Sequence, residues 1–204
     1  MGNILKKKSS NTILTTWFFK TRIITELKNL LGVGVNKIQI VSGFEIVLET
    51  AITNLYPIIH FLNKHTFCQS ESLMDIVCYD TLGKTHRFCL IYNLLSVHFN
   101  CRIRIASRFP ELSDVLSVMG LFKAANWLER EVFDFFGIFF LGNKDLRRIL
   151  TDYGFKGFPL RKDFPLTGYI DVYYDDNQKR VCYRNLEVSQ EYRTFNFVTK
   201  WKSI

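Results

Sequence analysis

The carboxylates best placed to do chemistry lie close together in the chain, at Glu129, Glu131 and Asp134. On a helix, Glu131 and Asp134 share a face, and the Arg130 guanidinium reaches Asp134 one turn later. Paired carboxylates bind divalent metals or act as general acid and base. All four histidines lie upstream of residue 99, so no imidazole joins the cluster. The pattern therefore favours a salt-bridged polar face of a helix over the site of a metal-dependent hydrolase.

A second cluster is basic and carries adjacent cations at Arg147-Arg148 and Arg161-Lys162. Guanidinium groups bind carboxylates or phosphates through two parallel hydrogen bonds. A phosphate site needs a glycine-rich loop that opens a helix, and no such pattern precedes these arginines. We therefore predict ion pairing or docking onto another protein. The predicted docking residues are Arg147, Arg148, Asp152, Tyr153, Arg161, Lys162 and Asp163.

The cysteines do not form a metal-binding pattern. They are Cys68, Cys78, Cys89, Cys101 and Cys182, spaced 10, 11, 12 and 81 residues apart. Structural zinc and iron–sulfur sites usually take ligands from close pairs, and no C-x-x-C pair occurs. We interpret the thiols as small apolar side chains in a reducing compartment and expect no metal. Dinucleotide-binding, P-loop and nucleophile-elbow motifs are also missing from the sequence.

Length and composition indicate one globular domain with an extended arm. The chain has 204 residues, of which 48% are hydrophobic. Its longest uncharged stretches have 14 residues, whereas a spanning helix needs about 20. The net charge of +8 is divided evenly, with +4 in residues 1–143 and +4 in residues 144–204. Because nucleic-acid-binding proteins usually concentrate positive charge in a stripe, a basic nucleic-acid-binding or ribosomal protein is the weaker alternative.

Hydrophobic periodicity predicts an α+β, two-layer domain with a mixed or antiparallel sheet, followed by a helical segment and an extended C-terminal arm. Expected helices span residues 18–31, 53–65, 113–120 and 124–136, and expected strands span 36–41, 44–49, 73–79, 86–95 and 100–106. A hairpin can form from 170–174 and 180–184. The corresponding division is an N-terminal tail (1–17), the α+β domain (18–137) and an aromatic, basic arm (138–204).

The arm is rich in glycine and proline between Gly154 and Gly168, which argues against regular secondary structure there. Its Tyr and Phe side chains would be a costly apolar strip in water. We therefore expect this arm to be ordered against its own domain or a partner, and we predict that a partner subunit chiefly orders it.

The sequences of three segments are specific enough to indicate a protein family. The segment Ala125-Asn-Trp-Leu-Glu-Arg-Glu-Val-Phe-Asp-Phe-Phe-Gly-Ile138 resembles the hallmark of the 30 kDa subunit family of respiratory complex I, called NADH dehydrogenase subunit 9 in organelles. Asp145–Phe155 and Gly157–Gly168 resemble its second and third conserved blocks. The residues of this chain that match the family signature are Trp127, Glu129, Arg130, Glu131, Asp134 and Gly137. We expect the large aromatic side chains of Trp127 and Phe135 in this segment to be buried.

Two positions depart from the family pattern. Asn143-Lys144 stands where the family has His-Pro, and Phe158 stands where it has a histidine. The departures argue against proton transfer at these positions and leave packing or docking roles intact.

The resemblance implies a core subunit of the hydrophilic, matrix-side arm of a proton-pumping NADH:ubiquinone oxidoreductase, peripheral to the mitochondrial inner membrane. The subunit would be a scaffold for the quinone-side module beside the 49 kDa subunit, with no catalytic residue and no flavin, cluster or nicotinamide site of its own. The complex would use FMN, iron–sulfur clusters, NADH and ubiquinone. The high Phe content suggests an AT-rich, organellar gene, and the basic, Ser/Thr-containing N-terminus fits either a transit peptide or a frayed end.

Overall fold

The computed structural model describes residues 27, 29, 32, 34–41, 45–187 and 193–195. The tail expected over residues 1–17 lies outside them, as does nearly all of the helix expected over residues 18–31. The chain divides into two compact units, Met1–Lys162 and Asp163–Ile204, which are described separately below.

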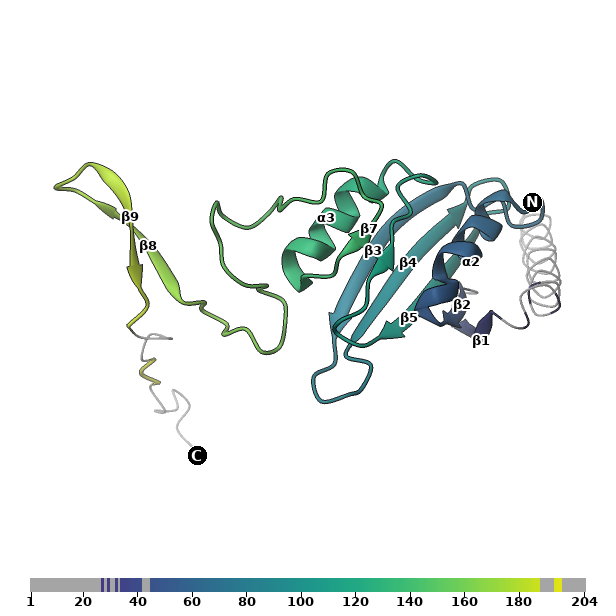
Figure 1. Cartoon of the computed structure of the whole chain (residues 1–204), viewed down its shortest axis with the longest axis horizontal. Helices are drawn as coiled ribbons and strands as arrows, with labels where there is room; N and C mark the ends of the chain where they lie inside the picture. Colours follow the sequence, from purple (N-terminus) through teal and green to yellow (C-terminus); the bar gives the residue numbers. More distant parts are fainter. Residues whose placement is uncertain are drawn as a thin grey trace, which may run out of the picture. The chain divides into compact units, whose positions relative to one another are not determined.

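The first unit is built on a five-stranded mixed sheet (Figure 1). Its strands are β1 (Val35–Val41), β2 (Glu45–Thr50), β3 (Ser72–Asp80), β4 (Phe88–Ser96) and β5 (Cys101–Phe109), in the order β1-β2-β5-β4-β3. β2 and β5 are parallel, and every other neighbouring pair is antiparallel. The α+β fold class and the positions of all five strands were predicted correctly. β5 has the alternation expected of a half-exposed strand, with Cys101, Ile103 and Ile105 buried.

Two helices cover one face of this sheet: α2 (Ile52–Lys64) and α3 (Ala125–Phe136) (Figure 1). Leu55, Ile59 and Leu62 of α2 share one continuous hydrophobic core with Val132 and Phe136 of α3. α2 begins one residue before the start expected at residue 53. Its N-cap is Ala51, so Pro57 lies beyond the first turn.

The prediction of a short helix over residues 113–120 is wrong. The structure instead has two-residue strands, β6 (Val115–Leu116) and β7 (Phe140–Leu141), which pair in parallel. Val115 and Phe140 are both buried in the core. This contact joins residues 25 positions apart, so local periodicity carries no signal of it.

The compact domain extends beyond the expected boundary at Gly137. Residues 138–162 belong to the first unit, although beyond β7 they contain no helix or strand. Backbone hydrogen bonds hold them to the domain, including one from the Leu160 N–H to the Phe135 carbonyl at 3.2 Å. The part of the expected arm before Asp163 therefore has backbone contacts to the domain of its own chain.

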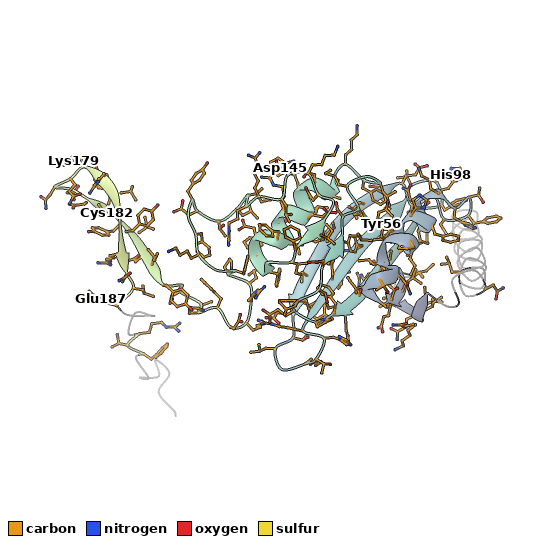
Figure 2. The ribbon with its side chains drawn as sticks, viewed as in Figure 1. Tyr56, His98, Asp145, Lys179, Cys182 and Glu187 are labelled. Atoms are coloured by element: carbon orange, nitrogen blue, oxygen red, sulfur yellow. The ribbon has the colours of Figure 1, made fainter. Side chains whose placement is uncertain are left out.

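The second unit contains the predicted hairpin, formed by β8 (Ile170–Asp175) and β9 (Arg180–Asn185). Lys179 lies in its turn at a φ of 52°, and Cys182 lies on β9 (Figure 2). Arg184 donates two hydrogen bonds to the Asp171 carboxylate across the pair, at 2.7 and 2.9 Å. The helices in the described part of the chain are all too short or too polar to cross a lipid bilayer.

Candidate functional site

Helix α3 carries two acidic side chains on its buried side, contrary to the expected solvent-exposed polar face. Glu129 and Asp134 are both 0% exposed, although each is ionisable. Carboxylates are almost never fully buried unless they are paired or hydrogen-bonded. The partners of these two groups therefore define the site.

Glu129 holds α3 to the segment around β6 and β7. Its carboxylate accepts hydrogen bonds from the Ser117 hydroxyl at 2.7 Å, the Val118 N–H at 2.8 Å and the Asn143 side-chain amide at 2.9 Å. Loss of water raises the pKa of Glu129, and the three donors oppose this shift. Asn143 thus has a structural contact within the chain.

Asp134 organises the segment that follows Arg147. One oxygen, Oδ2, accepts from three successive backbone amides, those of Ile149, Leu150 and Thr151, at 3.2, 2.8 and 2.9 Å. Burial tends to raise the pKa of Asp134, but the hydroxyl and amide hydrogen bonds outweigh burial and lower the pKa from 3.8 to about 2. The carboxylate is therefore a stable anion that satisfies amides of an irregular loop.

The arginines near α3 also bind within the chain. Arg148 forms an ion pair with Asp134 at 3.0 Å and donates to the Gly157 carbonyl at 2.8 Å. Arg130, expected to reach Asp134, instead donates from Nε to the Arg147 carbonyl at 3.1 Å and lies over the Trp127 ring. The expected i,i+4 pair is wrong because Asp134 points towards the 148–151 loop.

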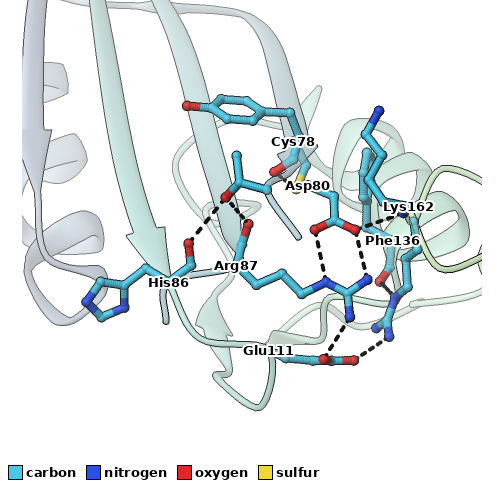
Figure 3. Close-up of polar contacts among 10 residues, drawn as sticks. Cys78, Asp80, His86, Arg87, Glu111, Phe136 and Lys162 are labelled. Atoms are coloured by element: carbon cyan, nitrogen blue, oxygen red, sulfur yellow. Dashed lines mark hydrogen bonds and ion pairs between the residues drawn. The ribbon is translucent and has the colours of Figure 1, made fainter. Parts of the chain in front are cut away.

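A third buried acid, Asp80 at the end of β3, anchors residues 160–162 (Figure 3). Its carboxylate accepts two hydrogen bonds from Arg87, at 2.8 and 2.9 Å, and one from the Lys162 N–H at 2.9 Å. The Arg87 hydrogen bonds lower the pKa of Asp80 despite its burial. Glu111 bridges Arg87 and Arg161, with nitrogen–oxygen distances of 2.9 and 2.6 Å.

Gly137 ends α3 in a left-handed conformation, with φ 72°. A Cβ atom there would lie 2.6 Å from the Phe158 ring and 2.9 Å from the Arg161 guanidinium. Arg161 also donates to the Phe136 carbonyl at 2.6 Å and lies over the Phe158 ring. Signature Gly137 is thus required both for the turn and for the close approach of residues 158–161.

The structure divides the predicted docking residues into two groups. Arg148 and Arg161 form ion pairs with Asp134 and Glu111 within the first unit, which agrees with the ion-pairing alternative of the prediction. The others lie at the surface: Arg147, Asp152, Tyr153 and Lys162 in the first unit, and Asp163 in the second. Tyr153 is 100% exposed, and the Arg147 side chain is 70% exposed and pairs with Asp145.

Signature residues Trp127 and Glu131 also lie outside the buried network. Trp127 is 64% exposed, so the sequence-based expectation that it is buried is wrong. Glu131 is half-buried beside β3. Leu150, at 58% exposed, adds an apolar side chain to the outside of the 148–151 loop.

Sequence reasoning missed most partners of the buried acids. Asp80 ends β3, Arg87 and Glu111 lie in loops, and the three residues share no motif. Ser117, Asn143 and Thr151 are common polar residues whose role depends on long-range packing.

Among the described residues, no group of three His, Cys, Asp or Glu side chains could hold a metal ion. Cys68, Cys78, Cys89 and Cys101 are buried thiols, as predicted, and Cys182 is partly exposed. Burial raises the pKa of Cys68 to about 11. This thiol is therefore protonated, which disfavours nucleophilic chemistry.

Comparison with known proteins identifies the family. The family model described as "Respiratory-chain NADH dehydrogenase, 30 Kd subunit" matches residues 48–170. The chain is 53% identical to NADH-ubiquinone oxidoreductase subunit 9 of Reclinomonas americana, over 81% of both chains. It is 49% identical to NADH-ubiquinone oxidoreductase subunit 9 of Prototheca wickerhamii, over 74% of this chain and 78% of the relative.

A solved structure shares the fold at low sequence identity. It is a chain of the membrane-bound sulfane sulfur reductase, an archaeal respiratory membrane complex, with a TM-score of 0.61 and 21% identity. The match covers 71% of this chain and 84% of that chain. The family match spans all three acid anchors, Asp80, Glu129 and Asp134. This chain belongs to the family of 30 kDa subunits of the respiratory-chain NADH dehydrogenase, complex I.

Proposed function

We propose that this chain is a non-catalytic, structural subunit of a proton-pumping NADH:ubiquinone oxidoreductase. In this proposal it lies on the matrix side of the mitochondrial inner membrane and holds the quinone-side module in register beside the 49 kDa subunit. Its family membership and relatives named as mitochondrial or ubiquinone-linked subunits support the assignment to the complex. FMN, the iron–sulfur clusters and the NADH and ubiquinone sites belong to other subunits.

The observation that supports a structural role is the burial and hydrogen bonding of two signature acids. Glu129 and Asp134 are fully buried, and their oxygens accept hydrogen bonds from Ser117, Asn143 and Thr151 of the same chain. An acid or base must come within hydrogen-bonding reach of the group it serves, directly or through water. These two carboxylates instead fix segments on both sides of α3 in the chain, residues 117–118 before it and residues 143 and 149–151 after it. Such rigidity matters because reactive groups in the complex must be held to within about an ångström.

The buried network leaves an outer surface suited to protein contact. Trp127, Leu150 and Tyr153 project from α3 and the loops that the acids fix. Large aromatic and arginine side chains dominate the energetics of protein interfaces, and Arg147 adds one such cation. This set, the signature patch, is the surface we propose for the neighbouring subunit.

The C-terminal hairpin supplies a second contact element. An isolated two-stranded hairpin is marginally stable in water. β8 and β9 nevertheless expose Val172, Tyr174, Val181 and Tyr183, each at least half exposed within this unit. A partner surface that covers these side chains would provide the burial that the hairpin lacks.

Assembly into the complex tests this proposal. The chain should co-migrate with NADH-oxidising activity on a native gel. Trp127→Ala combined with Tyr153→Ala should lower the amount of chain in that band without changing the unfolding midpoint of the free chain. Leu82→Ala, at a 59% exposed position in the turn after β3, serves as the matched control and should assemble normally. Absence of the chain from the active band would reject the assignment, and full assembly of the double variant would reject the signature patch.

A further inference from the structure

The groove at the outer edge of β3 has the features of a strand-binding site. β3 is the last strand of the sheet and, among the described residues, pairs only with β4. No backbone hydrogen bond within this part of the chain reaches its other edge. A nine-residue strand with one open edge is a template for pairing with another chain.

Beside this edge lies a groove with room for a side chain. It has a volume of about 130 Å³ and is lined by Ile76, Cys78, Val132, Phe135 and Leu160, among others. An apolar cavity of about 150 Å³ accommodates a benzene ring. Strand addition uses backbone hydrogen bonds for affinity and adjacent side-chain pockets for specificity. The edge and the groove together provide both.

The charges of the groove select the occupant. Asp75 and Glu131 both line it, and no basic side chain does. Among the described residues, neither carboxylate has an ion pair or a side-chain hydrogen bond, whereas Asp80 and Asp134 are paired. Asp75 also lines a second pocket that contains Arg102 and Arg104, whereas Glu131 meets no basic side chain in the groove. A carboxylate without an ion pair beside an apolar groove complements a segment that alternates lysine or arginine with apolar residues.

Protection of the edge is the competing explanation. A bulge between Leu73 and Asp75 interrupts pairing near the start of β3, and bulges and charges discourage unwanted strand addition. Beyond the bulge, however, β3 pairs regularly with β4 from Asp75 to Asp80. The same residues that repel an acidic or neutral strand favour a basic one, so protection and selection do not conflict.

We infer that the β3 edge and its groove bind a basic, extended segment of a neighbouring subunit by strand addition, with one apolar side chain of that segment in the groove beside Phe135 and Leu160. This inference rests on the proposed function, because it takes the partner from within the same complex. It adds a docking surface distinct from the signature patch and gives the chemistry of what binds there.

Photo-crosslinking in the assembled complex tests the inference. The full chain is given p-benzoylphenylalanine at Leu160, which is 51% exposed and lines the groove, or at Val97, which is 67% exposed and does not. The Leu160 probe should attach to a segment of another subunit in which basic and apolar residues alternate, and the Val97 probe should not. In the same complex, amide hydrogen exchange of residues 76–80 should slow at least tenfold relative to the free chain.

Charge reversal supplies the matched comparison. Asp75→Lys with Glu131→Lys should lower the Leu160 cross-link about tenfold, because each exposed pair contributes up to about fivefold in affinity. Glu71→Lys with Asp114→Lys makes the same change in net charge at exposed positions outside the groove and should leave the yield unchanged. Far-UV circular dichroism confirms that both variants fold.

Three results would overturn the inference: attachment to a second copy of this chain or to its own residues, attachment to an acidic segment, or a yield that charge reversal does not change. If one of these is found while the chain still co-migrates with NADH-oxidising activity, the docking surface is wrong and the proposed function stands. If the chain does not co-migrate, the proposed function itself fails.

Discussion

Thr151 donates both its backbone N–H and its hydroxyl to the carboxylate of Asp134, at 2.9 and 2.6 Å. The contact joins α3 to a loop 17 residues further along the chain, and two further amides and Arg148 complete it. The signature acid Asp134 therefore stabilises a loop of irregular backbone. Measurable consequences follow for stability, for its pH dependence and for assembly.

Replacement of Asp134 by Asn should destabilise the chain by about 3–5 kcal/mol. The substitution removes the charge that Arg148 faces, and its amide N–H group opposes backbone donors that need an acceptor. Urea unfolding of the full chain measures the change. Asp145→Asn, which alters an exposed pair with Arg147, is the control and should cost less than about 1 kcal/mol. Equal losses in both variants would contradict the role of Asp134.

Acid titration should reveal the same group. The pKa of Asp134 is about 2 in the folded chain and 3.8 ordinarily. A lowered folded pKa means stabilisation that is complete above about pH 4 and is lost as pH falls through about 2. The loss amounts to about 2 kcal/mol. The stability difference between the wild type and Asp134→Asn should shrink by that amount between pH 5 and pH 2. A constant difference would show that Asp134 titrates normally.

Gly137→Ala should be more damaging than Gly154→Ala, although both glycines have nearly the same positive φ, 72° and 73°. Alanine in the left-handed region costs about 1 kcal/mol at either site. Only at Gly137 does the new Cβ meet the Phe158 ring, at 2.6 Å, whereas nothing lies within 4 Å at Gly154. The extra cost should be about 1–3 kcal/mol in urea unfolding. Equal effects would mean that residues 158–161 move away without cost.

Trp127→Ala should change the stability of the free chain by less than about 1 kcal/mol, since the ring is largely exposed. Phe88→Ala, at a 0% exposed position in the core, should cost about 3–5 kcal/mol. Thermal unfolding of the two variants gives the comparison. A large loss for Trp127→Ala would show that this ring stabilises the fold through its contact with Arg130.

The main sheet was predictable because its strands are continuous in sequence and have clear alternation. Cys101–Phe109, for example, buries every second residue as its sequence indicates. The β6–β7 pair was not predictable, since each strand has only two residues and the contact is long-range. The boundary after Lys162 was missed for a related reason, because side-chain anchors at Asp80 and Asp134 replace regular backbone pairing.

The signature residues were identified from their sequence motif, but their structural roles were not predicted. Helical periodicity placed Glu129 and Asp134 on a polar face, and it could not show that loops 117–118 and 149–151 fold over that face. Trp127 was expected to be buried because it is a large aromatic side chain, and not because of its place in the helical pattern. In the structure the acids lie inside and the tryptophan lies outside.

The central claim is that Glu129 and Asp134, the buried signature acids of α3, stabilise the fold of the subunit and take no part in the redox reaction. The direct test measures NADH:ubiquinone turnover per assembled complex in the Glu129→Gln and Asp134→Asn variants, with complex content quantified on native gels. Both variants should reduce the amount of complex and leave turnover per complex unchanged, because each substitution weakens anchors such as Asn143 and Thr151. Normal amounts of complex with reduced turnover would contradict the claim and place these carboxylates in the reaction.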